Sequence, residues 1–337
     1  MNGYPLRPLV PSSAAGAYRG MALSAALLVS ACTGSDSAGL GSSSGPALTV
    51  DLGKALAALQ QPAGHNAGPP VLLIHGTDST SAQSWSTTYV PALTAAGFSV
   101  YTLDLPARAL GDIQASSEYV VLAIRFIATA TNSKLSIIGH SQGGLEPRWA
   151  LRWWPELRDK VEDLISLGTP QHGTEIANLN CIPGCPPSNW QMETGSNFLA
   201  ALNAGDETPG AADYSSIYSA SDELVQPQLP TSTSALAGAS NTLVQSVCPN
   251  HLVNHVALMR DPVVYALVLD ALTHAGGADP ARVAPEVCAQ ASISGVDPLA
   301  QFNAEEAYVI SFTDDSASYN TGAEPPLRDY AQGAANK

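Results

Sequence analysis

A buried strand that runs directly into a serine framed by glycines constrains the fold more than any other feature of this chain. The apolar segment 135–138 is followed without a break by Gly139-His140-Ser141-Gln142-Gly143. Apolar residues at helical spacing come next, over 145–154, and Pro155 ends them. A serine in a tight turn between a strand and a helix needs neighbours with minimal side chains, which the two glycines provide. The segment therefore predicts a strand, an exposed serine and a helix in an α/β protein.

The Gly-x-Ser-x-Gly pattern is short enough to arise by chance, and the chain contains it twice. The other copy is Gly41-Ser42-Ser43-Ser44-Gly45, inside a Ser/Gly-rich stretch. That copy has neither a strand pattern before it nor a helix pattern after it, whereas Ser141 has both. Ser141 is therefore the candidate nucleophile, and Ser43 is not.

Strand and helix patterns alternate between residues 51 and 273. The predicted strands are 71–74, 98–103, 135–138, 162–167, 214–219 and 242–247, and the predicted helices are 51–60, 85–96, 118–131, 145–154 and 262–273. Such alternation predicts a mostly parallel central sheet with helices on both faces. Together with the serine turn, it favours the α/β-hydrolase fold. We expect a catalytic domain over 51–275, a cap or lid at 173–210, and a C-terminal tail, 276–337, that wraps the surface.

The first 32 residues have the pattern of an export signal. Arg7 and Arg19 precede the apolar run 21–29, which is too short to span a bilayer comfortably. The run ends in Val29-Ser30-Ala31-Cys32, which resembles a bacterial lipoprotein box and predicts lipid attachment at Cys32. A Ser/Gly-rich tether is expected over 33–50. We therefore expect a secreted protein or a cell-envelope lipoprotein held at a membrane by its N-terminal lipid.

The remaining cysteines predict disulfides rather than a metal site. Setting Cys32 aside leaves Cys181, Cys185, Cys248 and Cys288, an even number in a chain expected to be exported. Three pairings are open; we favour Cys181 with Cys185 across a short turn, and Cys248 with Cys288. No His/Cys quartet has the spacing of a zinc site, so we expect no metal and no cofactor.

Chain order selects the candidate base, because the acid and then the histidine follow the serine in this fold. Four of the seven histidines come too early. His274 lies at the end of a predicted helix, where histidine commonly compensates the helix dipole. His255 lies in the loop before Asp261-Pro262, a good start for the last helix, near the sheet edge where ligands bind. We predict His255 as the base and His251 as a loop or surface residue.

The candidate acid and oxyanion donors come from loops after predicted strands. Asp222 is the first carboxylate after strand 214–219, and Glu223 is the alternative. The acid fixes the imidazole tautomer and stabilises the imidazolium. The oxyanion requires two backbone N–H donors, which we assign to Gln142, next to the nucleophile, and to Thr77, after strand 71–74.

Three segments resemble the Candida antarctica lipase B family and its bacterial relatives. They are Leu73 to Thr77, Ser141-Gln142-Gly143-Gly144-Leu145, and 217–228. The resemblance extends over roughly residues 50–290, and its third segment identifies Asp222 as the acid. It also implies that Thr77 and Gln142 form the oxyanion hole, that His255 is the base, and that Cys248 pairs with Cys288.

The chain also departs from that family. His140 precedes the nucleophile where the family lipase has a tryptophan at the floor of its alcohol pocket, so selectivity for secondary alcohols is not implied. The turn Gly168-Thr169-Pro170 is similar to one in bacterial lipases. The family's other disulfides have no counterpart here, and a Cys181–Cys185 bridge would be additional.

The expected function is hydrolysis of lipid carboxylic esters, with triacylglycerols favoured, through an acyl-Ser141 intermediate and without a cofactor. An acyltransferase or polyester hydrolase with the same triad is the alternative among enzymes, and a non-catalytic lipid-binding lipoprotein is the alternative outside them. The formal net charge of −15, without a Lys/Arg cluster, argues against nucleic acid as a partner. We expect a monomer.

Overall fold

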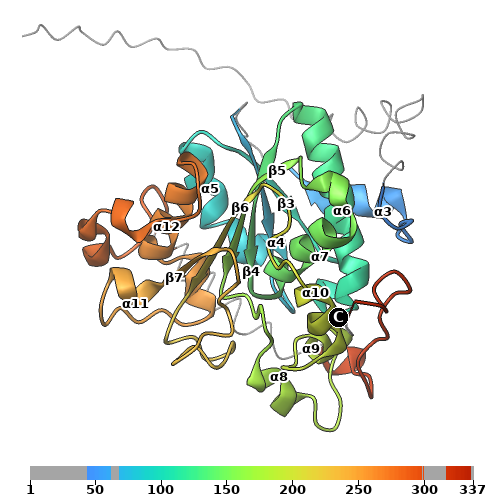
Figure 1. Cartoon of the computed structure of the whole chain (residues 1–337). Helices are drawn as coiled ribbons and strands as arrows, with labels where there is room; N and C mark the ends of the chain where they lie inside the picture. Colours follow the sequence, from blue (N-terminus) through green and yellow to red (C-terminus); the bar gives the residue numbers. More distant parts are fainter. Residues whose placement is uncertain (1–43, 62–67, 298, 300–315, 335–337) are drawn as a thin grey trace, which may run out of the picture. The chain divides into compact units, whose positions relative to one another are not determined.

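The computed structural model describes residues 44–61, 68–297, 299 and 316–334 (Figure 1). The predicted export signal and Cys32 lie outside the described residues. The end of the predicted 33–50 tether is described, and it packs on the domain. The indole N–H of Trp154 donates to the Pro46 carbonyl at 2.9 Å, and Glu118 accepts the Val50 amide at 2.9 Å. The folded part therefore begins earlier than the boundary predicted at residue 51.

The described strands form one sheet in the order β1-β3-β2-β4-β5-β6-β7. Neighbouring strands are parallel except β1 and β3, which are antiparallel. The strands are β1 (Leu59–Gln60), β2 (Pro70–Ile74), β3 (Ser99–Leu103), β4 (Leu135–His140), β5 (Val161–Leu167), β6 (Asp213–Tyr218) and β7 (Ser240–Leu243). The strands that follow β2 lie on opposite sides of it, β3 on one and β4 on the other. Such a switch point opens a crevice at the carboxyl ends of the strands, where ligands bind in α/β sheets.

Helices cover both faces of the sheet (Figure 1). They are α3 (Leu52–Ala58), α4 (Ser81–Trp85), α5 (Tyr89–Ala95), α6 (Ile113–Thr131), α7 (Leu145–Trp153), α8 (Glu175–Asn180), α9 (Pro187–Gln191), α10 (Asn197–Asn203), α11 (Val244–Val247) and α12 (Pro262–Thr273). Shorter 3-10 turns are η1 (Pro106–Ala109), η2 (Ser141–Gly144), η3 (Pro155–Leu157), η4 (Val256–Met259), η5 (Pro280–Arg282), η6 (Pro285–Ala289) and η7 (Ser316–Tyr319). None of the helices within the described ranges has the length and apolarity needed to cross a membrane.

The sheet separates two hydrophobic cores, and β2 contributes to both. Leu72 and Ile74 pack in the core beneath α6 and α7, while Val71 and Leu73 pack in the core beneath α5 and α12. All four side chains are fully buried. A strand covered on both faces has a continuous run of apolar residues, and this run is why β2 was predicted correctly from the sequence.

The helix predicted over 85–96 starts too early: α4 ends at Trp85, and α5 covers Tyr89–Ala95. Thr88 separates them with a non-helical backbone (φ −128°, ψ −91°). Pro91 explains the break. Proline has no N–H and its ring clashes with the preceding turn, so it fits the first turn of α5 but not the middle of a longer helix.

The strand predicted over 242–247 is also partly wrong. β7 ends at Leu243, and the next four residues form α11. Valine at 244 and 247 favours a strand by propensity, but tertiary packing overrides it: Val244 is fully buried in the core beneath α12, and Cys248, just after α11, is bridged. The helix predicted at 118–131 is extended at its start, since α6 begins after the cap residue Asp112.

The four cysteines form the two disulfides that the sequence favoured. Cys181 pairs with Cys185 just after α8, with their Cα atoms 4.6 Å apart. Cys248 pairs with Cys288 in η6, with Cα atoms 5.6 Å apart, and this bridge ties the start of the C-terminal tail to the end of α11.

The predicted cap segment, 173–210, contains α8, α9 and α10, and the described end of the tail lies against it (Figure 1). The Thr321 amide donates to the Cys185 carbonyl at 2.8 Å. The Glu324 carboxylate accepts the Phe198 amide at 2.8 Å, at the N-terminus of α10. The Arg328 amide donates to Gln114 of α6 at 2.8 Å. Residues 321–328 therefore link the cap segment to the helical face of the core.

Candidate active site

Ser141 lies at the turn between β4 and α7, and its backbone is strained. Its φ is +56°, in the left-handed region that residues other than glycine seldom adopt. A Cβ atom at position 139 would lie 2.2 Å from the Gly143 carbonyl oxygen, and one at position 143 would lie 2.5 Å from the His75 carbonyl oxygen. Both glycines are therefore required by close backbone contacts. This is the geometry in which a serine hydroxyl is presented above the edge of the sheet.

Asp222 and His255 form a buried pair. His255 Nδ1–H donates to Asp222 Oδ2 at 2.7 Å. The other carboxylate oxygen, Oδ1, accepts the backbone amides of Leu224 at 2.9 Å and Val225 at 2.8 Å. The side chain of Asp222 is fully buried and that of His255 nearly so. The loop after β6 thus holds the Asp222 carboxylate against the His255 imidazole.

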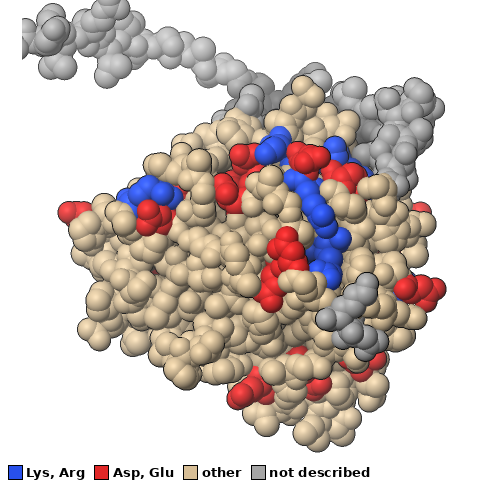
Figure 2. All heavy atoms as spheres, in the orientation of Figure 1, with Lys and Arg blue, Asp and Glu red and all other residues tan. Residues whose placement is uncertain are grey.

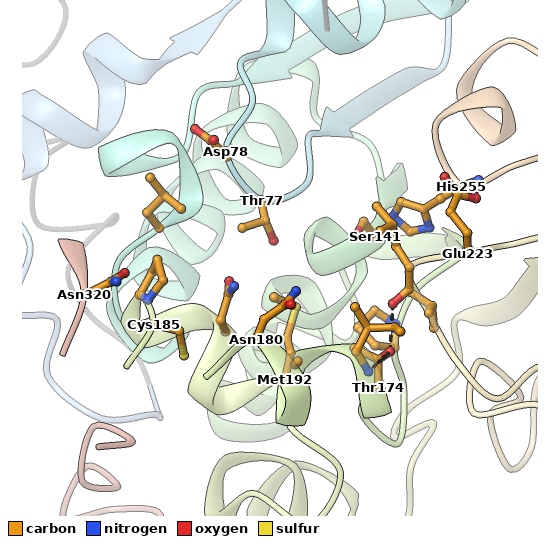
Figure 3. Close-up of a pocket in the computed structure, with 18 of the residues that line it drawn as sticks. Thr77, Asp78, Ser141, Thr174, Asn180, Cys185, Met192, Glu223, His255 and Asn320 are labelled. Carbon is orange, nitrogen blue, oxygen red and sulfur yellow. Dashed lines mark hydrogen bonds between the residues drawn. The ribbon is translucent and has the colours of Figure 1, made fainter. Parts of the chain in front are cut away.

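The pKa of His255 reflects two opposing effects. Burial, the largest, lowers the pKa, but the negative charge and hydrogen bond of Asp222 outweigh it and raise the pKa above its usual value. Glu223 raises the pKa of His255 further. The imidazolium is therefore stabilised at this position. His255 and Ser141 both line the same cavity (Figure 3).

Glu223, the alternative acid, contacts His255 differently from Asp222. Its Oε2 accepts the backbone amide of His255 at 3.0 Å and does not hold the ring. His251, the alternative base, lies apart from this pair. Its Nε2 donates to Asp261 at 2.6 Å, and Asp261 caps the N-terminus of α12.

The predicted oxyanion residues meet across two loops. Thr77, in the loop after β2, donates its hydroxyl proton to the side-chain carbonyl of Gln142 at 2.6 Å. The Thr77 loop packs on the nucleophile, since a Cβ at Gly76 would lie 2.9 Å from the Ser141 Cβ. His75 stabilises this loop through two hydrogen bonds. Its Nδ1–H donates to the Gly76 carbonyl at 2.8 Å, and its Nε2 accepts a hydrogen bond from the Leu105 amide at 2.9 Å. Burial lowers the pKa of His75, consistent with this neutral tautomer.

The cavity has a volume of about 570 Å³, and segments far apart in the sequence line it (Figure 3). Ile176, Asn180 and Met192 belong to the cap segment, while Asn320 belongs to the tail. Ser141, Thr77 and His255 line the opposite part, at the carboxyl ends of the strands. No group of three or more potential metal-binding side chains occurs in the described part of the chain.

Residues 68–266, more than half of the chain, match the family described as lipase (class 2). The chain belongs to this family. It is 35% identical to lipase B of Pseudozyma antarctica over 215 residues, which cover 62% of this chain and 63% of that protein. It is 30% identical to a triacylglycerol lipase of Pseudarthrobacter phenanthrenivorans over 116 residues, 33% of this chain and 35% of the relative.

A solved structure gives the same fold. The crystal structure of Aspergillus fumigatus lipase B superposes with a TM-score of 0.79 at 28% identity, over 85% of this chain and 73% of that chain. The match confirms the α/β-hydrolase fold and the resemblance to lipase B that the sequence motifs indicated. The chain spans less than two thirds of the length of the Pseudozyma relative.

His140 has a role in the site that the sequence did not reveal. Its side chain is fully buried and is not among the residues that line the cavity. Its Nε2–H donates to the His255 carbonyl at 2.9 Å, and the centroids of the His140 and His255 rings are 4.7 Å apart. Burial, helped by the nearby His255, lowers the pKa of His140 well below its usual value. A neutral His140 therefore fixes the backbone of the candidate base without competing for its charge.

Glu146 is the second site residue that the sequence patterns did not single out. It lies in the first turn of α7, is fully buried, and accepts the side-chain amide of Gln142 at 2.8 Å. Burial raises the pKa of Glu146 to about 8. The available signal was its spacing, four residues after Gln142, which places both side chains on one face of a helix.

Proposed function

We propose that this chain is a carboxylic-ester hydrolase, a triacylglycerol lipase or esterase, in which Ser141, Asp222 and His255 form the catalytic triad. One observation carries the proposal: His255, which is hydrogen-bonded to the buried Asp222, and a strained nucleophile-elbow serine line the same cavity. Membership of the class 2 lipase family supports it.

In the proposed reaction, His255 Nε2 accepts the hydroxyl proton of Ser141 as the oxygen attacks the ester carbonyl. Asp222 stabilises the imidazolium that results. The backbone amides of Gln142 and Thr77 stabilise the negative charge on the carbonyl oxygen. The tetrahedral intermediate collapses, the imidazolium protonates the departing alcohol, and an acyl-Ser141 ester remains. Water, deprotonated by His255, then attacks this ester. The second tetrahedral intermediate collapses to the fatty acid as the imidazolium returns the proton to the Ser141 oxygen.

Lipid esters are the proposed substrates because of the apolar character of the cavity and its surroundings. Ile176, Met192 and Val256 line it. On the cap segment, Leu179 and Ile182 are 69% and 79% exposed, and the face shown in Figure 2 carries few charged side chains over most of its area. Exposed aliphatic side chains beside an apolar cavity are suited to contact with a lipid surface. Two relatives are themselves named lipases.

The test is a series of p-nitrophenyl esters from acetyl to palmitoyl beside an emulsified triglyceride, assayed with the wild type and Ser141→Ala. We expect the wild type to release fatty acid from the esters and the emulsion, and the variant to release none above background. Product analysis with added alcohol separates hydrolysis from acyl transfer, since a transferase gives a new ester in place of fatty acid. A wild type inactive on every ester would contradict the proposal.

We also propose that the chain is exported and anchored by lipid at Cys32. The two disulfides of the structure are typical of proteins in oxidising compartments. Expressed in a bacterial host, the mature protein is expected to begin at Cys32, carry lipid and partition into detergent. Cys32→Ser is expected to release the protein or leave it unprocessed, with the esterase still active. An unlipidated mature chain that begins elsewhere, measured by intact mass, would remove the anchor from this account.

A further inference from the structure

The side chain of Gln142 forms hydrogen bonds to two separate parts of the site. The oxyanion role proposed for its backbone amide does not explain these contacts. The side chain is fully buried. Its carbonyl oxygen accepts the Thr77 hydroxyl at 2.6 Å, and its amide nitrogen donates to Glu146 Oε1 at 2.8 Å. A continuous hydrogen-bonded chain therefore runs from the loop after β2, through the residue next to the nucleophile, to the first turn of α7.

Glu146 is an unusual residue to find at the end of this chain. Its side chain is fully buried, and it also accepts a hydrogen bond from the Ser116 hydroxyl, at 3.3 Å. The second oxygen, Oε2, has no hydrogen-bond partner in the described part of the chain. A buried carboxyl with an unpartnered oxygen is unfavourable for stability, so such a group requires an explanation, and a role at a reactive site is one.

The direction of the hydrogen bonds indicates that role. A side-chain amide has a carbonyl at one end and an NH₂ group at the other, and the two are hard to distinguish by shape. In the structure, Glu146 Oε1 accepts from the NH₂ end of Gln142, which leaves the carbonyl end facing the Thr77 hydroxyl. The position of Glu146 therefore fixes the orientation of the Gln142 amide and, through it, the acceptor that holds the Thr77 hydroxyl.

The charge state of Glu146 fits the same role. Because burial raises the pKa of Glu146 to about 8, the carboxyl is largely uncharged near neutral pH. A neutral group can orient the Gln142 amide without placing a negative charge close to the oxyanion that develops during the reaction.

We propose that Glu146 is a positioning residue for the oxyanion hole, which holds the Gln142 amide in the orientation that fixes Thr77 beside Ser141. The inference rests on the proposed function, because an oxyanion hole matters only if Ser141 attacks an ester. Glu146 itself touches neither the substrate nor the reacting atoms.

The test compares Glu146→Leu with Glu146→Gln, using kcat and KM for p-nitrophenyl butyrate and enzyme concentrations titrated with a fluorophosphonate. Leucine cannot accept a hydrogen bond, so kcat is expected to fall about tenfold or more, a part of the loss seen when an oxyanion donor is removed, with KM within about twofold. Glutamine keeps an acceptor for Gln142 and no charge, so kcat is expected within about threefold of the wild type.

A matched control is Glu118→Leu, which replaces another buried glutamate that lies on α6 and binds residues 49 and 50 instead of the site. Its kcat is expected to stay within about twofold of the wild type. If Glu146→Leu fails to fold, Gln142→Ala cuts the same chain while leaving Glu146 and the backbone donor in place, and its kcat is expected to fall to a similar extent.

The double variant Gln142→Ala/Glu146→Leu is expected to be no slower than Gln142→Ala alone, because both changes break one chain. Additive losses, a Glu146→Gln variant as slow as Glu146→Leu, or an unchanged kcat in Glu146→Leu or Gln142→Ala would each overturn the inference. These results differ from failure of the proposed function, in which the wild type itself hydrolyses no ester.

Discussion

Two buried carboxyl groups, those of Asp222 and Glu146, lie close to Ser141. They differ in how many of their oxygens accept hydrogen bonds. Asp222 has donors for both oxygens: two backbone amides on Oδ1 and the His255 ring on Oδ2. Glu146 has donors on one oxygen only, and burial raises its pKa to about 8. The number of donors, more than burial itself, distinguishes a residue suited to stabilise an imidazolium from one suited to remain uncharged.

The first prediction at this scale separates Asp222 from Glu223. Asp222→Asn is expected to lower kcat by about 10⁴, because the asparagine no longer selects the imidazole tautomer that accepts the serine proton. Glu223→Gln keeps an acceptor for the His255 amide and is expected to cost far less. Steady-state kinetics on one soluble ester measures both, and equal losses would show that Asp222 does not hold the ring in the way proposed.

A second residue-scale prediction concerns pH and stability. In the unfolded chain Glu146 ionises near pH 4.5, whereas in the folded protein its pKa is about 8. The folded state therefore binds this proton more tightly than the unfolded state. The contribution of protonated Glu146 to the free energy of unfolding is fully present below pH 4.5 and is lost as the pH rises toward 8. The loss is about 5 kcal/mol over that window if the unfolded pKa is unperturbed.

Glu146→Gln lacks this titration, so the comparison isolates it from other ionisable groups common to both proteins. Denaturant unfolding between pH 5 and 8 should show the wild type losing free energy of unfolding relative to the variant as the pH rises. A difference that is constant across the window would mean that Glu146 is already ionised in the folded protein.

At the scale of elements, the turn from β4 to α7 is determined by backbone contacts. Gly139→Ala would place a Cβ 2.2 Å from the Gly143 carbonyl, which neither β4 nor η2 can relieve without shifting Ser141. We expect a loss of about 3 kcal/mol in the free energy of unfolding and loss of ester hydrolysis. Gly111→Ala is the control, because a Cβ there meets nothing within 4 Å. Equal effects of the two changes on stability and activity would contradict the role given to this turn.

Sequence patterns predicted helices and strands well where both faces of the element are buried. They predicted them poorly where tertiary packing determines whether a segment is a helix or a strand. β2 and β4 were predicted because strands covered on both faces are continuous apolar runs. Pro91 carried a usable signal for the break between α4 and α5, since proline belongs in the first turn of a helix. The change from β7 to α11 carried no such signal, because Val244 favours a strand by propensity and only its burial beneath α12 overrides that preference.

At the scale of the whole molecule, the fold forms a cavity that no local sequence pattern predicts. The cavity wall joins Thr77, Met192 and Asn320, which only the complete fold brings together. Motif order and strand ends predicted His255 and left Asp222 or Glu223 as its partner; the family resemblance favoured Asp222, which lies against His255. Thr77 and Gln142 were predicted as oxyanion donors, and their side chains are hydrogen-bonded to each other. The burial of Glu146 could not be predicted, because a glutamate on a helix is normally solvated and only the assembled core buries it; its spacing from Gln142 was the one available signal.

The claim that Ser141 is an activated nucleophile is central, and covalent labelling tests it most directly. The protein is incubated with a fluorophosphonate, and intact mass and peptide mapping locate the adduct. We expect one adduct per chain, on Ser141, formed by the wild type and by Ser43→Ala but not by Ser141→Ala. Failure of the folded wild type to label, or an adduct that persists in Ser141→Ala, would contradict the account.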